Sequence, residues 1–141
     1  MKTTISIFFT IVLMFCAFTS FSQTASKSNE ISGIKKGMIK VTIFYPNGEG
    51  KKFNVDYYAT KHMPMVKSLL GEKVIAYAVD KGLSSELPNS PAPYLAIGYL
   101  YFDSMDAFQN AMSDPISAKK MEADVPNYTN CKPVVQISEV F

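Results

Sequence analysis

The sequence predicts an α+β domain of the ferredoxin-like class, in which a β-α-β-β-α-β chain places both helices on one face of the sheet. Two observations carry this prediction. Residues 38–45 and 94–102 alternate as strands do, and residues 54–70 hold apolar side chains at the helical period between them. A chain of 141 residues has room for one such domain, which we assign to residues 38–141.

The first 22 residues have the layout of a secretory signal peptide. A positive start at Lys2 precedes an apolar run over 5–18, and the small residues Ser20 and Ser22 precede a cleavage site before Gln23. The apolar run is too short for a stable membrane span. We therefore expect export, to the periplasm or out of the cell, and a mature protein without a membrane span.

Cys16 raises the alternative of a lipoprotein, because Leu13 stands where a lipoprotein signal needs a leucine. The two residues between them are bulky where that signal needs small ones, so soluble export is favoured. Removal of the signal leaves Cys131 as the single cysteine, which excludes an intrachain disulfide. Residues 23–37, rich in Ser, Lys, Asn and Gly, are expected to form a flexible linker.

The first helix is expected to run from a cap at Asn54 or Asp56 to Leu70, with Gly71 ending it. Its apolar face is expected to hold Val55, Tyr58, His62, Val66 and Leu69. Pro64 removes one backbone hydrogen bond inside this helix, so we expect a kink near His62.

Prolines, glycines and aspartates place the remaining elements. These are strands over 74–81, 94–102 and 134–141, with a proline-rich loop over 82–93. Asp103 is expected to cap a second helix, which packs Met105, Phe108 and Met112 on its inner side. Asp114 and Pro115 begin a further helical segment, and Pro126 ends it.

The third strand is apolar or aromatic on both faces. Leu95, Ile97, Tyr99 and Tyr101 share one face, and Tyr94, Ala96, Leu100 and Phe102 share the other. Helices cover only one face of such a sheet, so the other would be a large exposed apolar patch. We expect two copies to pair these faces as a homodimeric α+β barrel, whose cavity holds a small hydrophobic molecule.

Charge and composition exclude several classes of function. The predicted domain has ten lysines, no arginine and eleven acidic residues, so a nucleic-acid or phosphate reader is not expected. One histidine and one mature cysteine without clustered carboxylates do not make a conventional metal site. No cofactor motif is present, but haem stays open because it needs only one protein ligand.

His62 is the only histidine, and its ordinary pKa suits proton transfer near neutrality. Tyr58 lies one turn earlier on the same face, where it can orient the imidazole. The alternative is a buried structural histidine, bonded to the backbone carbonyl that Pro64 frees near Thr60.

Alternation in the first and last strands groups a second set of candidates. Lys40, Thr42, Phe44, Gln136 and Ser138 are expected on the inner side of the barrel. These residues either line a mixed pocket or occupy ordinary edge and solvent positions.

Several segments of the predicted domain resemble the EthD family, which is named for a component of ethyl tert-butyl ether degradation and belongs to the dimeric α+β barrel superfamily. They are Met38-Ile39-Lys40-Val41, Tyr45-Pro46, Asp56-Tyr57-Tyr58, Lys61-His62-Met63-Pro64, Asp80-Lys81-Gly82, Tyr101-Phe102-Asp103, Pro126-Asn127-Tyr128-Thr129 and Gln136-Ile137-Ser138-Glu139. The resemblance covers residues 38–141.

The resemblance implies a dimer with a small hydrophobic ligand between helices and sheet, and a site at His62 with Tyr57, Tyr58 and Asp80 as neighbours. EthD-like proteins are commonly labelled oxidoreductases, and the wider superfamily includes cofactor-free isomerases, cyclases and oxygenases as well as haem enzymes. An export signal argues against a need for reduced nicotinamide cofactors or a cytoplasmic oxygenase partner.

Three functions follow as hypotheses. The first is an oxidoreductase-type or cofactor-independent enzyme that acts on a small hydrophobic or carbonyl compound, with His62 moving a proton. The second is a non-catalytic small-molecule binding protein that uses the same cavity. The third is a haem-binding, monooxygenase-like barrel.

Overall fold

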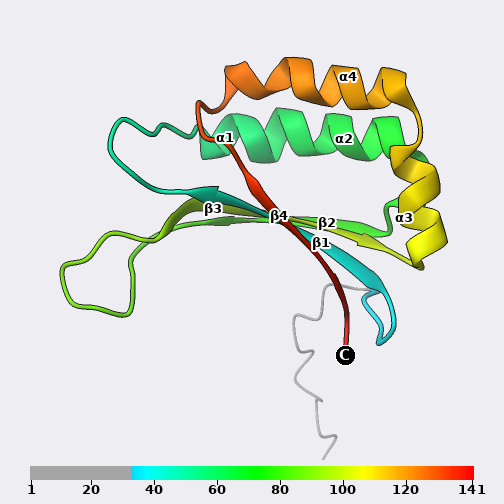
Figure 1. Cartoon of the computed structure of the whole chain (residues 1–141), viewed down its shortest axis with the longest axis horizontal. Coiled ribbons are helices and arrows are strands. Elements are labelled where there is room, and N and C mark those ends of the chain that lie inside the picture. Colours follow the sequence, from blue (N-terminus) through cyan, green and yellow to red (C-terminus); the bar gives the residue numbers. More distant parts are fainter. Residues whose placement is uncertain (1–32) are drawn as a thin grey trace, which may run out of the picture.

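The computed structural model describes residues 33–141, which form one four-stranded sheet with helices on a single face (Figure 1). The predicted signal peptide (1–22) and the first part of the predicted linker (23–32) lie outside the described residues. The strands are β1 (Ile39–Pro46), β2 (Ala76–Lys81), β3 (Tyr94–Phe102) and β4 (Val134–Glu139). The helical elements are α1 (Val55–Tyr57), η1 (Tyr58–His62), α2 (Met63–Leu70), η2 (Gly71–Lys73), α3 (Met105–Met112), α4 (Pro115–Asp124) and η3 (Val125–Asn127).

The strand order β2-β3-β1-β4, with every pairing antiparallel, confirms the ferredoxin-like α+β fold. β1 lies in the middle because β3 and β4 each pair with it along its length. Side chains of β1 therefore lie at the centre of both faces of the sheet. Val41 and Tyr45 face the helices, whereas Thr42 and Phe44 face the opposite side.

The first helical stretch contains a π-helical turn at the place where a kink is predicted. Asn54 caps it by accepting from the Tyr57 N–H, and regular helix gives way to η1 before resuming at Met63. Pro64 lies in the first turn of α2, where its missing N–H interrupts the hydrogen-bond ladder. A π-helical turn holds one residue more than an α-helical turn, which changes the side chains that face the core. Leu70, and not Leu69 as predicted, therefore packs into the core.

Several predicted boundaries need correction. Ser104, not Asp103, caps α3, because its hydroxyl accepts from the Ala107 N–H. Met105 and Met112 are both about two-fifths exposed, so the inner side of α3 is less buried than predicted. β2 begins at Ala76 because the chain first turns through η2, and β4 ends at Glu139.

The last predicted linker residues are ordered against the sheet. The Gly37 N–H donates to the Val140 carbonyl, and the Val140 N–H donates to the Met38 carbonyl. The described structure of the domain therefore begins before Met38.

The hydrophobic core lies between the sheet and the helices. Its largest fully buried side chains are Tyr58, Phe102, Met63 and Val74. Within residues 33–141, none of the helices is long and apolar enough to cross a membrane.

Candidate functional site

A cavity of about 330 Å³ lies between the sheet and the helices. This is the lower part of the range for small-molecule sites. Its lining is formed by Val41, Ile43, Tyr45, Tyr58, His62, Met63, Val66, Leu70, Leu100, Phe108, Met112, Ala118, Met121 and Val135. Tyr45, Tyr58 and His62 are the only members of this set that carry a side-chain oxygen or nitrogen, and none carries a permanent charge.

His62 lies at the end of the π-helical turn and is 6% exposed. Its Nδ1 lies 2.8 Å from Oδ2 of Asp124, the last residue of α4. The two helices therefore each supply one member of a buried imidazole–carboxylate pair. A carboxylate at Nδ1 fixes the imidazole tautomer in which Nδ1 carries the proton and Nε2 is free to accept one.

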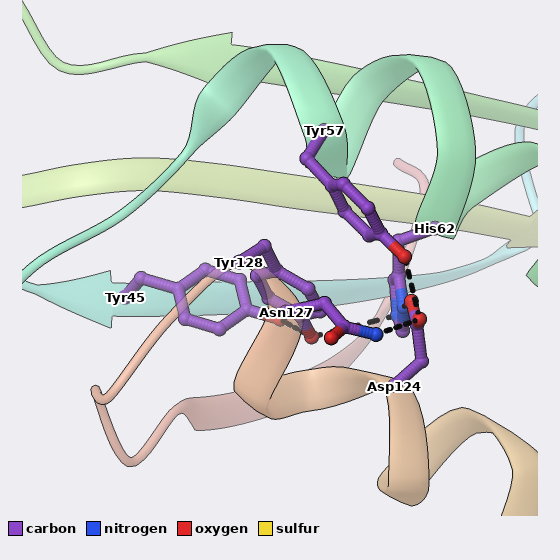
Figure 2. Close-up of polar contacts among 6 residues, drawn as sticks. All are labelled: Tyr45, Tyr57, His62, Asp124, Asn127 and Tyr128. Atoms are coloured by element: carbon purple, nitrogen blue, oxygen red, sulfur yellow. Dashed lines mark hydrogen bonds and ion pairs between the residues drawn. The ribbon is translucent and has the colours of Figure 1, made fainter.

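Asp124 is itself held by two further donors (Figure 2). The Tyr57 hydroxyl and the Asn127 amide each donate to Oδ1 at 2.8 Å, and Figure 2 shows both side chains and His62 converging on this carboxylate. Burial acts to raise the pKa of Asp124, but the hydrogen bonds from His62, Asn127 and Tyr57 outweigh it and leave the pKa below its ordinary value. Asp124 is therefore ionised at neutral pH.

Tyrosines surround the other side of the imidazole. The Tyr128 hydroxyl lies 3.5 Å from His62 Nε2 and 3.1 Å from the Tyr45 hydroxyl. The Tyr58 ring stacks on the imidazole, with centroids 5.3 Å apart and planes 16° apart. Burial is the main cause that raises the pKa of Tyr45, Tyr58 and Tyr128 above 10, so all three hydroxyls stay protonated at neutral pH.

The Tyr58 side chain fits against β3 because Gly98 has no side chain. A Cβ at this position would overlap the Tyr58 hydroxyl and come within 3.1 Å of its Cζ. The tyrosine ring can therefore lie flat against His62 only because the strand beneath it carries no side chain here.

A family model, the EthD domain, matches residues 48–131, more than half of the chain. The chain belongs to the EthD family. The crystal structure of an EthD-like protein from Ralstonia eutropha JMP134 is 40% identical, with 74% of this chain and 93% of that chain covered at a TM-score of 0.68. No curated protein matches the chain.

Two more distant structures share the fold of this EthD domain. An EthD family protein from Bacillus halodurans C-125 is 17% identical, covers 74% of this chain and 99% of its own, and has a TM-score of 0.53. A protein from Arabidopsis thaliana is 15% identical, covers 73% and 95%, and has a TM-score of 0.53.

The structure brings three of the predicted site residues together on the first helical stretch. Tyr58 stacks on His62 and both line the cavity, while Tyr57 donates to Asp124. Asp80 needs correction as a neighbour of His62. It is exposed on β2 and accepts a hydrogen bond from Tyr99 at 2.8 Å. Both residues point to the sheet face opposite the helices, because Tyr99 alternates with Gly98 and Leu100.

The five predicted pocket residues also lie on the open sheet face, away from the helices. Pairing places Lys40 beside Ser138 and Tyr101, and places Thr42 beside Gln136 and Tyr99, while Phe44 follows on the same side. None of these residues lines the cavity that contains His62. This is the face predicted to become the inner side of a barrel, so their role in lining a pocket there stays a prediction.

Four residues of the site were not predicted, namely Asp124, Asn127, Tyr45 and Tyr128. Asp124 of α4 and Tyr128 after η3 contact His62, Asn127 of η3 donates to Asp124, and Tyr45 of β1 contacts the Tyr128 hydroxyl. Tyr45 and Tyr128 belong to segments that carry the EthD resemblance, and this was the one signal that pointed to them. The alternative of a histidine bonded to a freed backbone carbonyl is wrong, because the Nδ1 partner is a carboxylate.

The positions of the side chains also decide whether they could hold a metal ion or a haem. Among residues 33–141 no group of three or more histidine, cysteine, aspartate or glutamate side chains is placed to hold a metal ion. A haem iron would need His62 Nε2, which lies against the Tyr128 hydroxyl, while Tyr58 covers the ring. The residues present therefore do not fit a haem.

Proposed function

We propose that the chain is an exported, homodimeric EthD enzyme that moves a proton on a small apolar carbonyl compound or its enol, without a cofactor. His62 is the base. The observation that carries the proposal is the position of its imidazole, between an ionised carboxylate and an apolar cavity of ligand size.

The contacts of His62 support this role chemically. Asp124 keeps the proton on Nδ1, so Nε2 is the basic nitrogen, and the carboxylate stabilises the imidazolium that forms when Nε2 takes a proton. The neutral tyrosine hydroxyls can donate to a developing negative charge on a substrate oxygen. The apolar lining excludes water and strengthens both interactions.

The homodimer is supported by the sheet face that the helices leave open (Figure 1). Phe44, Ile97, Tyr99 and Tyr101 lie together on it across β1 and β3. In the single chain Phe44, Ile97 and Tyr99 are half-buried and Tyr101 is buried, and a second copy would cover the apolar surface that remains. Two copies that pair these faces would complete the α+β barrel, with the two His62 cavities on its outer sides.

The proposal is tested with para-nitrophenol, a stable mimic of an enol that absorbs differently as phenol and phenolate. The full chain is expressed in an exporting host, purified, and mixed with the probe one pH unit below the probe's own pKa. We expect the bound probe to be ionised, and we expect His62→Gln to bind it without ionising it. Equal ionisation by wild type and His62→Gln would show that His62 is not the base.

A non-catalytic binding protein is the second candidate, and one observation favours it. Every buried side-chain nitrogen and oxygen within residues 33–141 already has a hydrogen-bond partner, so none of these atoms is left unpaired for catalysis. Native mass spectrometry of the exported protein identifies any molecule that copurifies. Incubation with that molecule then separates the candidates, because an enzyme converts it and a carrier returns it unchanged.

A further inference from the structure

We propose that the hydroxyls of Tyr45 and Tyr128 carry the proton between the substrate and His62, and that the substrate is a neutral apolar molecule with an acidic hydroxyl, an enol or a phenol. This inference rests on the proposed role of His62 as the base. It adds the path of the proton and the chemical group that loses it.

Both nitrogens of the imidazole are occupied by protein groups. Nδ1 faces Asp124 at 2.8 Å, and Nε2 faces the Tyr128 hydroxyl at 3.5 Å. The stacked Tyr58 ring covers one face of the imidazole, and the His62 side chain is 8% exposed. His62 lines the cavity, but a substrate proton reaches a ring nitrogen through one of these two partners.

The Asp124 side is not a route from the cavity. Asp124 is absent from the cavity lining, and its other carboxylate oxygen is taken by Tyr57 and Asn127. The Tyr128 side is a route. Tyr128 contacts Tyr45 at 3.1 Å, and the Tyr45 side chain lines the cavity.

The direction of each hydrogen bond follows from Asp124. An ionised Asp124 accepts from Nδ1–H, so Nε2 is an acceptor and the Tyr128 hydroxyl donates to it. The Tyr128 oxygen is then left to accept, and the Tyr45 hydroxyl donates to it. The Tyr45 oxygen can still accept a proton, and the Tyr45 side chain lines the cavity.

The transfer balances as a chain of three proton transfers. The substrate O–H bond breaks and its proton joins the Tyr45 oxygen, while the former Tyr45 proton moves to Tyr128. The former Tyr128 proton moves to Nε2. The products are a substrate oxyanion and an imidazolium paired with Asp124, and both tyrosines end neutral.

The cavity lining limits which molecules can use this path. No lysine, arginine, aspartate or glutamate lines it, so an ionised substrate would enter without a partner for its charge. The polar groups lie together around His62, and the remaining lining residues are apolar. This arrangement fits an apolar body that carries one hydroxyl, directed at Tyr45.

The experiment uses the same para-nitrophenol probe on the protein expressed from the full chain. Equilibrium dialysis measures the amount of probe bound, and absorbance measures the fraction of it present as phenolate. We expect Tyr45→Phe and Tyr128→Phe to bind the probe but, in stopped-flow absorbance, to form its phenolate at least tenfold more slowly than wild type. Tyr77→Phe, which removes a hydroxyl from exposed β2, is the matched control and is expected to behave as wild type.

The two aromatic variants keep the buried rings, and thermal melting verifies that each one folds. Because they break the chain at different hydroxyls, either one alone tests the path. Ionisation at the wild-type rate in Tyr45→Phe or Tyr128→Phe, with His62→Gln inactive, would overturn the relay and leave His62 as a base that contacts the ligand directly. A wild-type protein that binds the probe without ionising it would overturn both the relay and the proposed function.

Discussion

His62 Nδ1 and Asp124 Oδ2 lie 2.8 Å apart although 62 residues separate them in the chain. The imidazole belongs to the first helical stretch and the carboxylate closes α4, so the pair joins the two helical halves of the fold. The same contact between helices places the proposed base beside its carboxylate partner. Each change to this pair should therefore alter activity and stability in ways that can be measured separately.

Asp124→Asn is expected to slow proton transfer to His62 by a factor on the order of 10²–10⁴, the contribution of a positioned acid–base system. The amide keeps the shape of the carboxylate but removes the charge that stabilises the imidazolium. Stopped-flow absorbance with para-nitrophenol measures the rate. Glu122→Gln, an equal loss of charge at an exposed position of α4, should leave the rate unchanged.

Stability at acid pH should depend on Asp124. Its pKa is below the ordinary value of 3.8, so its contribution to folding is fully present above pH 3.8 and is lost as the pH falls through the folded-state pKa. Urea unfolding at a series of acid pH values measures this. Asp124→Asn should show a shallower loss of stability with acid, and an unchanged slope would contradict the assignment.

Stability at alkaline pH should depend on the buried tyrosines. Tyr45, Tyr58 and Tyr128 have pKa values raised above 10, so their contribution is present below pH 10 and is lost as the pH rises beyond it. Circular dichroism and tyrosinate absorbance should therefore change together in one cooperative transition for these residues. Ionisation of all the tyrosines before any loss of structure would argue against their burial.

Gly98→Ala is expected to destabilise the fold by about 1–3 kcal/mol, the usual cost of adding a methyl group to a packed site. The added methyl collides with the Tyr58 hydroxyl. The double variant Gly98→Ala with Tyr58→Phe removes that oxygen and should recover part of the loss. Chemical unfolding of the four proteins in this cycle gives the coupling, and strict additivity would rule out the collision as the cause.

Ile97→Lys is expected to convert the proposed dimer to a monomer, because it places a charge in the middle of the open sheet face. Analytical ultracentrifugation measures the mass in solution. Lys81→Glu, at the end of edge strand β2, serves as a surface control. A wild-type protein that sediments as a monomer would remove the basis for the barrel.

The sequence was sufficient for the fold because its signals are local. Alternation marks β1 and β3, Asn54 is the one of two predicted caps that caps its helix, and Pro115 begins α4 as predicted. The predicted N-cap was wrong where two neighbouring residues both suit that position, as Asp103 and Ser104 do before α3. The shift from Leu69 to Leu70 was not predictable, because a regular helical period cannot anticipate the extra residue of a π-helical turn.

The site was less accessible to prediction because its contacts are long-range. Nothing local distinguishes Asp124 from the exposed acidic residues around it, and its role appears only when α4 docks beside α2. Asp80 shows the opposite error. Its resemblance to a family segment suggested a neighbour of His62, but alternation with Val79 places it on the other face of β2.

The π-helical turn from Tyr58 to His62 has a consequence for how this domain can change. A single-residue deletion inside the turn would restore a regular α-helix and rotate the upstream residues by roughly 100° about its axis. Met63, Val66 and Leu70 would keep facing the sheet, while Tyr58 and the cap residue Asn54 would leave their places. Such a deletion would therefore separate the His62–Asp124 pair from Tyr57 and Tyr58, the two residues of this helix that hold it.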